Sequence, residues 1–155
     1  MRNKRRYILA RIDPPYPEPD QREIFQALAE AIASLYGDLG ASKIQAAVIS
    51  CGGGYTIVRC TRGTEGMLLA AMSTVTRVRE DRLALRSCLA SGTLLALRRA
   101  VQESPAPAVQ EEREVQFSGR MFQSVRYHGE KVDLVEKGFK SQERLFLTRE
   151  DLEDY

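Results

Sequence analysis

The chain has 155 residues, of which 43% are hydrophobic and 28% charged, so it can bury one core and carry an appendage. Its apolar runs are too short to cross a membrane, and its basic first residues precede only a short apolar stretch, which excludes a secretory signal. We therefore expect a cytoplasmic protein with no membrane partner.

Charge is distributed unevenly along the chain. Residues 1–100 contain 15 Lys and Arg against 9 Asp and Glu, whereas residues 101–155 contain 8 against 12. The basic excess favours binding of a polyanion by the first part, with an acidic attachment behind it. A solvated basic N-terminus would give the same composition, so both interpretations stay open.

Residues 6–13 have the alternation of a half-buried strand. The apolar set, which we expect to face the core, is Ile8, Ala10 and Ile12; the opposite set is Tyr7, Leu9 and Arg11. A proline-rich segment follows, and Asp20 with Glu23 then forms a capping-box pattern that predicts a helix start. Gly37 predicts the end of this helix.

Three glycines, Gly52–Gly54, join two apolar runs and predict a hairpin of strands 43–51 and 55–61. On the second strand, Thr56, Val58 and Cys60 would face the core, and Tyr55, Ile57 and Arg59 the opposite side. A second helix is predicted after Thr64, which is expected to be its cap.

Residues 82–90 predict a fourth strand. We expect Leu83, Leu85 and Leu89 to point inward and Arg82, Arg86 and Cys88 outward. A Ser91–Thr93 loop then opens a third helix, whose exposed backbone N–H groups would bind an anion near Arg98 and Arg99. Helix capping alone explains the Ser and Thr equally well.

This order of elements predicts an α+β fold, a ferredoxin-like or RRM-like βαββαβ sandwich with an additional C-terminal helix. Its first and third strands would be central, so Tyr7, Arg11, Tyr55 and Arg59 would share one face with Arg86. That face is either open to RNA or covered by the third helix. If it is open, Leu9, Ile57, Leu94 and Leu95 lack cover and indicate a protein interface.

Composition divides the chain into a domain over residues 1–103, a linker over 104–114 and an irregular extension over 115–155 with short strands and a short helix. The extension is too sparse to bury a core alone, so we expect it to dock on another surface or to fray. Cys51, Cys60 and Cys88 lack metal-ligand spacing and are predicted to be core thiols.

The sequence contains no recognisable set of catalytic groups. His128 is the single histidine, and no phosphate-binding loop, HExxH motif or cysteine–histidine metal set occurs. We therefore expect no catalytic residue, metal ligand or cofactor in the chain, and a binding subunit instead of a self-sufficient enzyme.

Three short motifs resemble protein component 2 of archaeal and eukaryotic ribonuclease P: Arg6-Tyr-Ile-Leu9, Gly54-Tyr-Thr-Ile-Val-Arg-Cys60 and Ser91-Gly-Thr93. They occur in the family's order, and the resemblance covers about Arg5 to Arg99. It implies an RRM-like subunit that assists a catalytic RNA in removing the 5′ leader of precursor tRNA. The magnesium ions belong to that RNA.

The resemblance also implies partners: the catalytic RNA, precursor tRNA, a TIM-barrel-type protein subunit and other holoenzyme proteins. The predicted RNA-binding residues are Arg5, Arg6, Tyr7, Arg11, Tyr55, Arg59, Arg86, Ser91, Gly92, Thr93, Arg98 and Arg99. The alternative is a ferredoxin-like regulatory or small-ligand-binding module in an unrelated assembly. RNA binding would weaken steeply with salt, whereas binding of an uncharged ligand would not.

Overall fold

The computed structural model describes residues 4–15, 17–106, 111–126, 131–136 and 144–153. It divides into two compact units, Met1–Ala106 and Pro107–Tyr155. No helix in these ranges is long and apolar enough to span a membrane.

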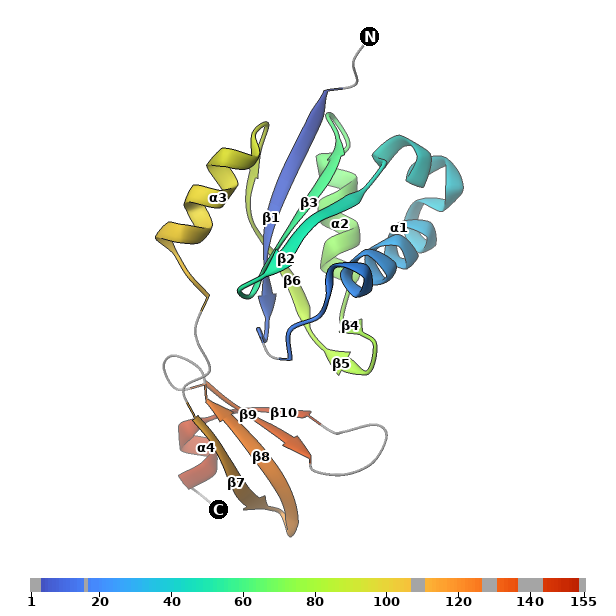
Figure 1. The fold of residues 1–155 in the computed structure, drawn as a ribbon. Helices are drawn as coiled ribbons and strands as arrows, with labels where there is room; N and C mark the ends of the chain where they lie inside the picture. Colours follow the sequence, from blue (N-terminus) through green and yellow to red (C-terminus); the bar gives the residue numbers. More distant parts are fainter. Residues whose placement is uncertain (1–3, 16, 107–110, 127–130, 137–143, 154–155) are drawn as a thin grey trace. The chain divides into compact units, whose positions relative to one another are not determined.

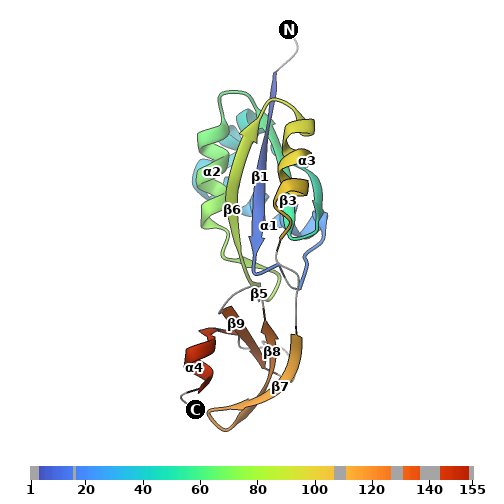
Figure 2. The ribbon, with the colours of Figure 1, turned by 90° about the vertical axis from the view of Figure 1, so that its left-hand side faces the viewer.

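The first unit is a mixed α/β domain built on an antiparallel sheet of order β2-β3-β1-β6. Its elements are β1 (Arg5–Asp13), α1 (Gln21–Ile44), β2 (Ala47–Gly52), β3 (Tyr55–Thr61), α2 (Glu65–Thr74), β4 (Arg77–Val78), β5 (Asp81–Arg82), β6 (Ala84–Ser91) and α3 (Leu94–Glu103). Strands and helices occur in the predicted order, with the short β4–β5 hairpin as an addition. Helices α1 and α2 lie on one side of the sheet and α3 on the other (Figures 1 and 2).

The start of α1 is confirmed, and so is the break at Gly37, but a second helical stretch that was not predicted follows the break. The Asp20 side chain accepts from the Glu23 N–H (2.8 Å), and the Glu23 carboxylate accepts from the Asp20 N–H (2.9 Å), which closes the capping box. Gly37 adopts φ 62° and interrupts the helix, and helical structure then resumes as far as Ile44. Residues 43 and 44, predicted to begin the second strand, therefore belong to the last turn of α1, where Ile44 is fully buried, and β2 begins at Ala47.

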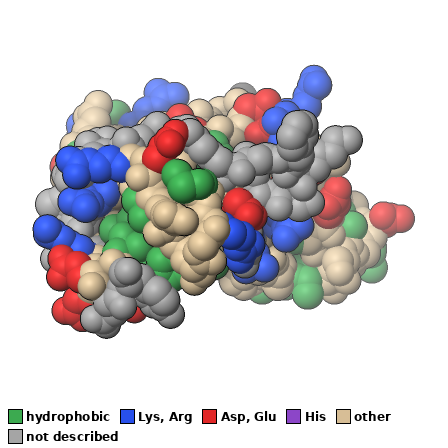
Figure 3. Space-filling view, turned by 90° about the horizontal axis from the view of Figure 1, so that it is seen from below, with side chains coloured by type: hydrophobic (Ala, Val, Ile, Leu, Met, Phe, Trp, Pro, Cys, Tyr) green, Lys and Arg blue, Asp and Glu red, His purple; other side chains and the backbone are tan. Residues whose placement is uncertain are grey.

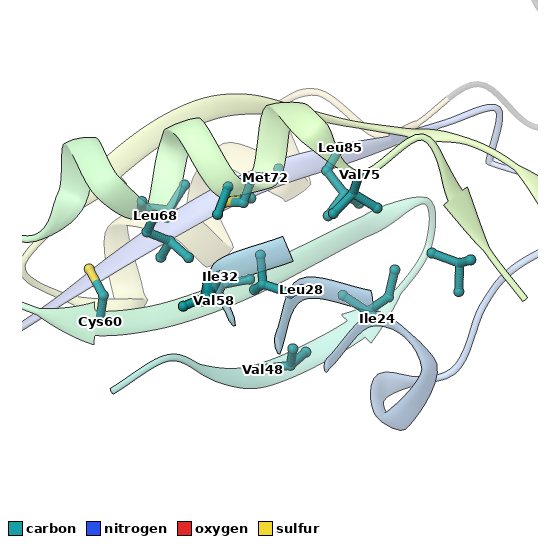
Figure 4. Close-up of a cluster of buried hydrophobic side chains, with 14 of the residues drawn as sticks. Ile24, Leu28, Ile32, Val48, Val58, Cys60, Leu68, Met72, Val75 and Leu85 are labelled. Carbon is teal, nitrogen blue, oxygen red and sulfur yellow. The ribbon is translucent and has the colours of Figure 1, made fainter. Parts of the chain in front are cut away.

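The main core lies between the sheet and the pair α1 and α2. The predicted inward residues of β1 and β3 are all fully buried: Ile8, Ala10, Ile12, Thr56, Val58 and Cys60. Figure 4 shows Leu68 and Met72 of α2 in one cluster with Val58 of β3. Strand alternation therefore predicted this layer correctly.

The opposite face of the sheet is covered by α3. Leu97 of α3 is fully buried in a second cluster with Leu9, Tyr55 and Ile57, which are 2%, 8% and 4% exposed. Of the two alternatives left open by the sequence, an open face or cover by the third helix, the structure has the second. The physical reason is the spacing of Leu94, Leu97 and Val101, which turns one apolar stripe of α3 towards the sheet.

A bulge in β6 changes the predicted facing of Leu89. The register with β1 shifts between Leu9, opposite Leu89, and Ala10, opposite Ser87, so Cys88 is the additional residue. Leu89 consequently lies on the α3 side and is 42% exposed, so its predicted inward orientation is wrong.

The three thiols differ in burial. Cys60 is buried, as predicted for a core thiol, whereas Cys88 is exposed on β6 and does not fit that prediction. Cys51 is half-buried and its thiol donates to the Pro19 carbonyl (3.1 Å). Burial, helped by the nearby carboxylates of Glu18, Asp20 and Glu23, raises the pKa of Cys51 to about 11.

The second unit is an antiparallel sheet of order β10-β9-β8-β7 with one short helix. Its elements are β7 (Glu111–Phe117), β8 (Arg120–Arg126), β9 (Lys131–Glu136), β10 (Arg144–Thr148) and α4 (Arg149–Glu153). Phe122, Val132 and Leu134 are buried together, with Leu152 of α4 against them. Strand β7 begins inside the predicted linker, and this unit buries a small core, which the sequence analysis did not expect. Pairing of four strands collects their alternate apolar residues on one face.

Candidate nucleic-acid interface

Basic residues gather where β1 begins and β3 ends. Arg5 is paired with Thr61 in the sheet, and the Arg62 N–H donates to the Lys4 carbonyl (2.9 Å), which extends this pairing by one residue. We call this region the basic end and define it as Lys4, Arg5, Arg6, Arg59 and Arg62. It lies at the end of β1 nearest the N-terminus in Figure 1.

One carboxylate, Glu65, faces the basic end among the described residues. The Arg6 Nε lies 3.1 Å from Glu65 Oε1, and the Gly63 N–H donates to Glu65 Oε2 (2.6 Å). Hydrogen bonds from the backbone N–H groups of Glu65 and Gly63, with the charges of Arg6 and Arg62, lower the pKa of Glu65. Arg5 donates to the side-chain oxygen of Gln45 (2.8 Å), an uncharged partner. The basic end therefore keeps a net positive charge at neutral pH.

Arg59 has the most distinctive environment of these residues. It stands opposite Tyr7 on β1 and Ala47 on β2, on the side of the sheet that α3 covers. Its Nε is buried without a hydrogen-bond partner in the described part of the chain. A partly desolvated guanidinium attracts an anion more strongly than a fully hydrated one, because water screens it less.

The loop that opens α3 lies beside the basic end. Ser91 stands opposite Tyr7 in the sheet, and its hydroxyl oxygen accepts from the Thr93 N–H (3.1 Å). A Cβ at Gly92 would lie 3.7 Å from an Arg6 nitrogen, so this loop passes close to that guanidinium. Thr93 is the N-cap of α3 but its side chain makes no capping hydrogen bond. The first N–H groups of α3 thus point out of the helix next to Arg6.

The other predicted arginines of the sheet lie one strand length away and share a carboxylate. Arg86 Nε lies 2.6 Å and Arg11 Nη2 3.9 Å from the same oxygen of Asp13. Arg11 and Arg86 are paired in the sheet, so they have the common facing that alternation predicts. Because Asp13 neutralises part of their charge, this pair presents a weaker positive field than the basic end.

Tyr55 belongs to the packing between α3 and the sheet. Its hydroxyl donates to the Ser104 carbonyl (2.6 Å) at the end of α3, and its ring is 8% exposed. A ring in this position has no free face on which a nucleobase could stack.

Removal of this hydroxyl provides a test. We expect Tyr55→Phe to lower the free energy of unfolding by about 1 kcal/mol, because the partly buried Ser104 carbonyl loses its donor. RNA affinity should not change. Urea unfolding and RNA titration of the same variant measure both quantities, and a loss of affinity without a loss of stability would contradict the packing role.

The remaining predicted residues, Arg98 and Arg99, lie on the solvent side of α3. Both are exposed and neither has an ion-pair partner among the residues described. Leu95, on the same helix, is 60% exposed, whereas Leu9 and Ile57 are covered by α3. Of the four apolar residues predicted to lack cover, Leu95 is thus the one that is clearly exposed.

Sequence reasoning missed Lys4 and Arg62. Lys4 precedes the first predicted strand and Arg62 follows the third. An antiparallel register between these two strands would have placed them opposite each other. On the face seen in Figure 3, by contrast, basic and acidic side chains are interspersed. His128 lies outside the described residues, and the described residues contain no group of three or more His, Cys, Asp or Glu that could hold a metal ion.

A mixed α/β domain with a net positive sheet end and few acids beside it is typical of proteins that bind polyanions. The chain belongs to the Rpp14/Pop5 family, whose sequence model matches residues 6–102.

Two relatives resemble the chain over nearly its whole length. Both are named ribonuclease P protein component 2: that of Methanoculleus marisnigri is 48% identical and that of Methanosphaerula palustris 43% identical, each over 99% of this chain and 95% of the relative. A chain in the cryo-EM structure of yeast ribonuclease MRP has the same fold in the matched part, with a TM-score of 0.50 and 16% identity over 66% of this chain and 92% of that chain. The two relatives therefore include the second unit, which the family model does not.

Proposed function

We propose that the chain is protein component 2 of a ribonuclease P. In this role it binds the catalytic RNA and assists it in removing the 5′ leader of precursor tRNA. The observation that carries the proposal is the basic end, in which Lys4, Arg5, Arg6, Arg59 and Arg62 lie together and Glu65 pairs with Arg6. Membership of the family and the names of the two archaeal relatives support it.

The finer fold assignment is part of the same proposal. We assign residues 5–103 to the ferredoxin-like, RRM-like sandwich with an additional C-terminal helix, in which β1 and β3 are central. The strand order β2-β3-β1-β6 and the crossover helices α1 and α2 on one face support this assignment.

RNA contact at the basic end would be made through phosphates. Guanidinium groups bind phosphate oxygens bidentately, and Arg59, whose buried Nε has no partner among the described residues, would do so through its terminal nitrogens. The first N–H groups of α3, which the Thr93 side chain does not cap, add donors beside Arg6. Such contacts hold a folded RNA by its shape and carry no base sequence information.

In this proposal the cleavage chemistry and its magnesium ions belong to the RNA, and the chain has no cofactor of its own. Precursor tRNA, a TIM-barrel-type protein subunit and other holoenzyme proteins complete the assembly. The exposed Leu95 and the cations Arg98 and Arg99 of α3 are available for these contacts. A cytoplasmic location fits the three free thiols, since unpaired cysteines are typical of reducing compartments.

Reconstitution tests the function. Leader removal by the catalytic RNA with its other protein subunits should be slower at low magnesium without this chain and recover when it is added. The chain alone should not cleave. Equal activity with and without the chain, or cleavage by nuclease-treated protein free of RNA, would contradict the proposal.

Arg59→Ala tests the site. We expect RNA binding to weaken by about 1–2 kcal/mol, the usual range for a charged hydrogen bond, and the salt slope to fall by about one contact. Arg22→Ala, which removes an exposed charge from α1, is the matched control and should leave affinity nearly unchanged. If Arg59 instead stabilises the sheet, its removal would lower the melting temperature and leave the affinity of the folded protein intact.

A further inference from the structure

The β4–β5 hairpin places two arginines directly opposite each other. Its ladder pairs Arg77 with Arg82 and Val78 with Asp81, and the Leu83 N–H donates to the Thr76 carbonyl (3.2 Å) behind it. Opposite residues of an antiparallel ladder lie on the same face, with Cβ atoms about 5 Å apart. Like charges in this arrangement repel each other and destabilise the hairpin.

Among the residues that the structure describes, no acid forms an ion pair with either arginine that would offset this repulsion. Val78 is 3% exposed and points into the core, so Asp81 opposite it lies on the inner face and Arg77 and Arg82 on the outer one. Both arginines are exposed and make no ion pair or hydrogen bond within the described residues. Glu30 lines a groove of about 400 Å³ that also includes Arg77, but no ion pair joins them.

The hairpin is held in place by its other residues. Its third arginine, Arg79, forms an ion pair with Glu23, the same carboxylate that closes the capping box of α1. Burial of Val78 fixes the inner face. Because the hairpin is anchored at two points, little conformational entropy would be lost when its outer face binds a ligand.

We infer that Arg77 and Arg82 form a second phosphate-binding site for RNA, an inference that rests on the proposed function. The hairpin lies at the opposite end of the sheet from the basic end (Figure 1). β1 has nine residues, so the two sites are separated by about 30 Å, the length of that strand. One RNA could thus be held at both ends of the domain. Binding of a phosphate between the two guanidiniums would also remove their mutual repulsion.

The test combines Arg77→Ala, Arg82→Ala and the double variant with measurements of affinity for the catalytic RNA at several salt concentrations and of melting temperature without RNA. We expect the double variant to bind about tenfold more weakly, with a salt slope reduced by about 0.7 to 0.9, the value for one phosphate. Its melting temperature should be unchanged or higher at low salt, since the repulsion is gone. Arg22→Ala serves again as the charge-loss control.

Arg82→Glu separates binding from folding more sharply. It places a carboxylate opposite Arg77, so it should raise the melting temperature while weakening RNA binding at least as much as Arg82→Ala. Wild-type affinity and salt slope in the double variant, with Arg59→Ala still impaired, would overturn the second site and leave the proposed function intact. Loss of affinity for a protein subunit alone would overturn it as well, because the site would then bind acidic protein. Absence of RNA binding by the unaltered chain would overturn both.

Discussion

Leu97→Ala is expected to lower the free energy of unfolding by about 2–4 kcal/mol, the usual cost of truncating a fully buried leucine. Leu97 is the central contact of α3 with Leu9, Tyr55 and Ile57 of the sheet. Its truncation leaves a cavity there and weakens the attachment of α3. The loop at Ser91–Thr93 should loosen with the helix, so RNA affinity should fall too.

Leu95→Ala on the same helix is the matched control. Leu95 is 60% exposed, so its truncation should change stability by no more than about 0.5 kcal/mol. Denaturant unfolding of both variants measures the difference. Equal stability of the two variants would mean that α3 does not pack on the sheet through Leu97.

Gly40→Ala is expected to destabilise the protein by about 2–3 kcal/mol. A Cβ at Gly40 would lie 2.1 Å from the Tyr36 Cβ, far inside contact distance, and neither atom can move without its backbone. The close approach results from the kink at Gly37, which turns the last part of α1 back over Tyr36. Within a regular helix the same substitution would stabilise, so the expected sign is reversed here.

Gly66→Ala is the control for this reversal. Gly66 lies in α2, and a Cβ there would meet no atom within 4 Å. Alanine should therefore stabilise by about 0.5–1 kcal/mol through helix propensity. Thermal unfolding of both variants shows whether each substitution raises or lowers stability. Stabilisation by Gly40→Ala would contradict the kinked geometry of α1.

The main layer of the fold could be predicted from local patterns. The capping box at Asp20 and the alternation around Ile8 and Val58 depend on neighbouring residues alone, and they appear in the structure as expected. The interruption at Gly37 appears as predicted, but the helical stretch after it could not be predicted, because a glycine with positive φ can end a helix or only bend it. The bulge at Cys88 likewise could not be predicted from the alternation of residues, since it depends on pairing with β1.

The candidate site was predictable in its residue types but not in its pairing. Strand alternation predicted that Arg11 and Arg86 have the same facing. That both lie near the carboxylate of Asp13 depends on where the strands end in the folded sheet, which alternation does not give. Lys4 and Arg62 become neighbours through the register of β1 and β3. Side-chain periodicity says which way a residue faces, whereas register decides what it meets.

The most direct test of the account compares two charge-matched double variants in RNA binding across salt concentrations. Arg59→Ala with Arg62→Ala removes two cations from the basic end, and Arg11→Ala with Arg86→Ala removes the two that share Asp13. The account predicts that the first pair lowers the salt slope by about 1.5 to 2 and weakens binding, while the second changes both only slightly. A larger loss in the second pair, with the first pair binding like the unaltered chain, would contradict it.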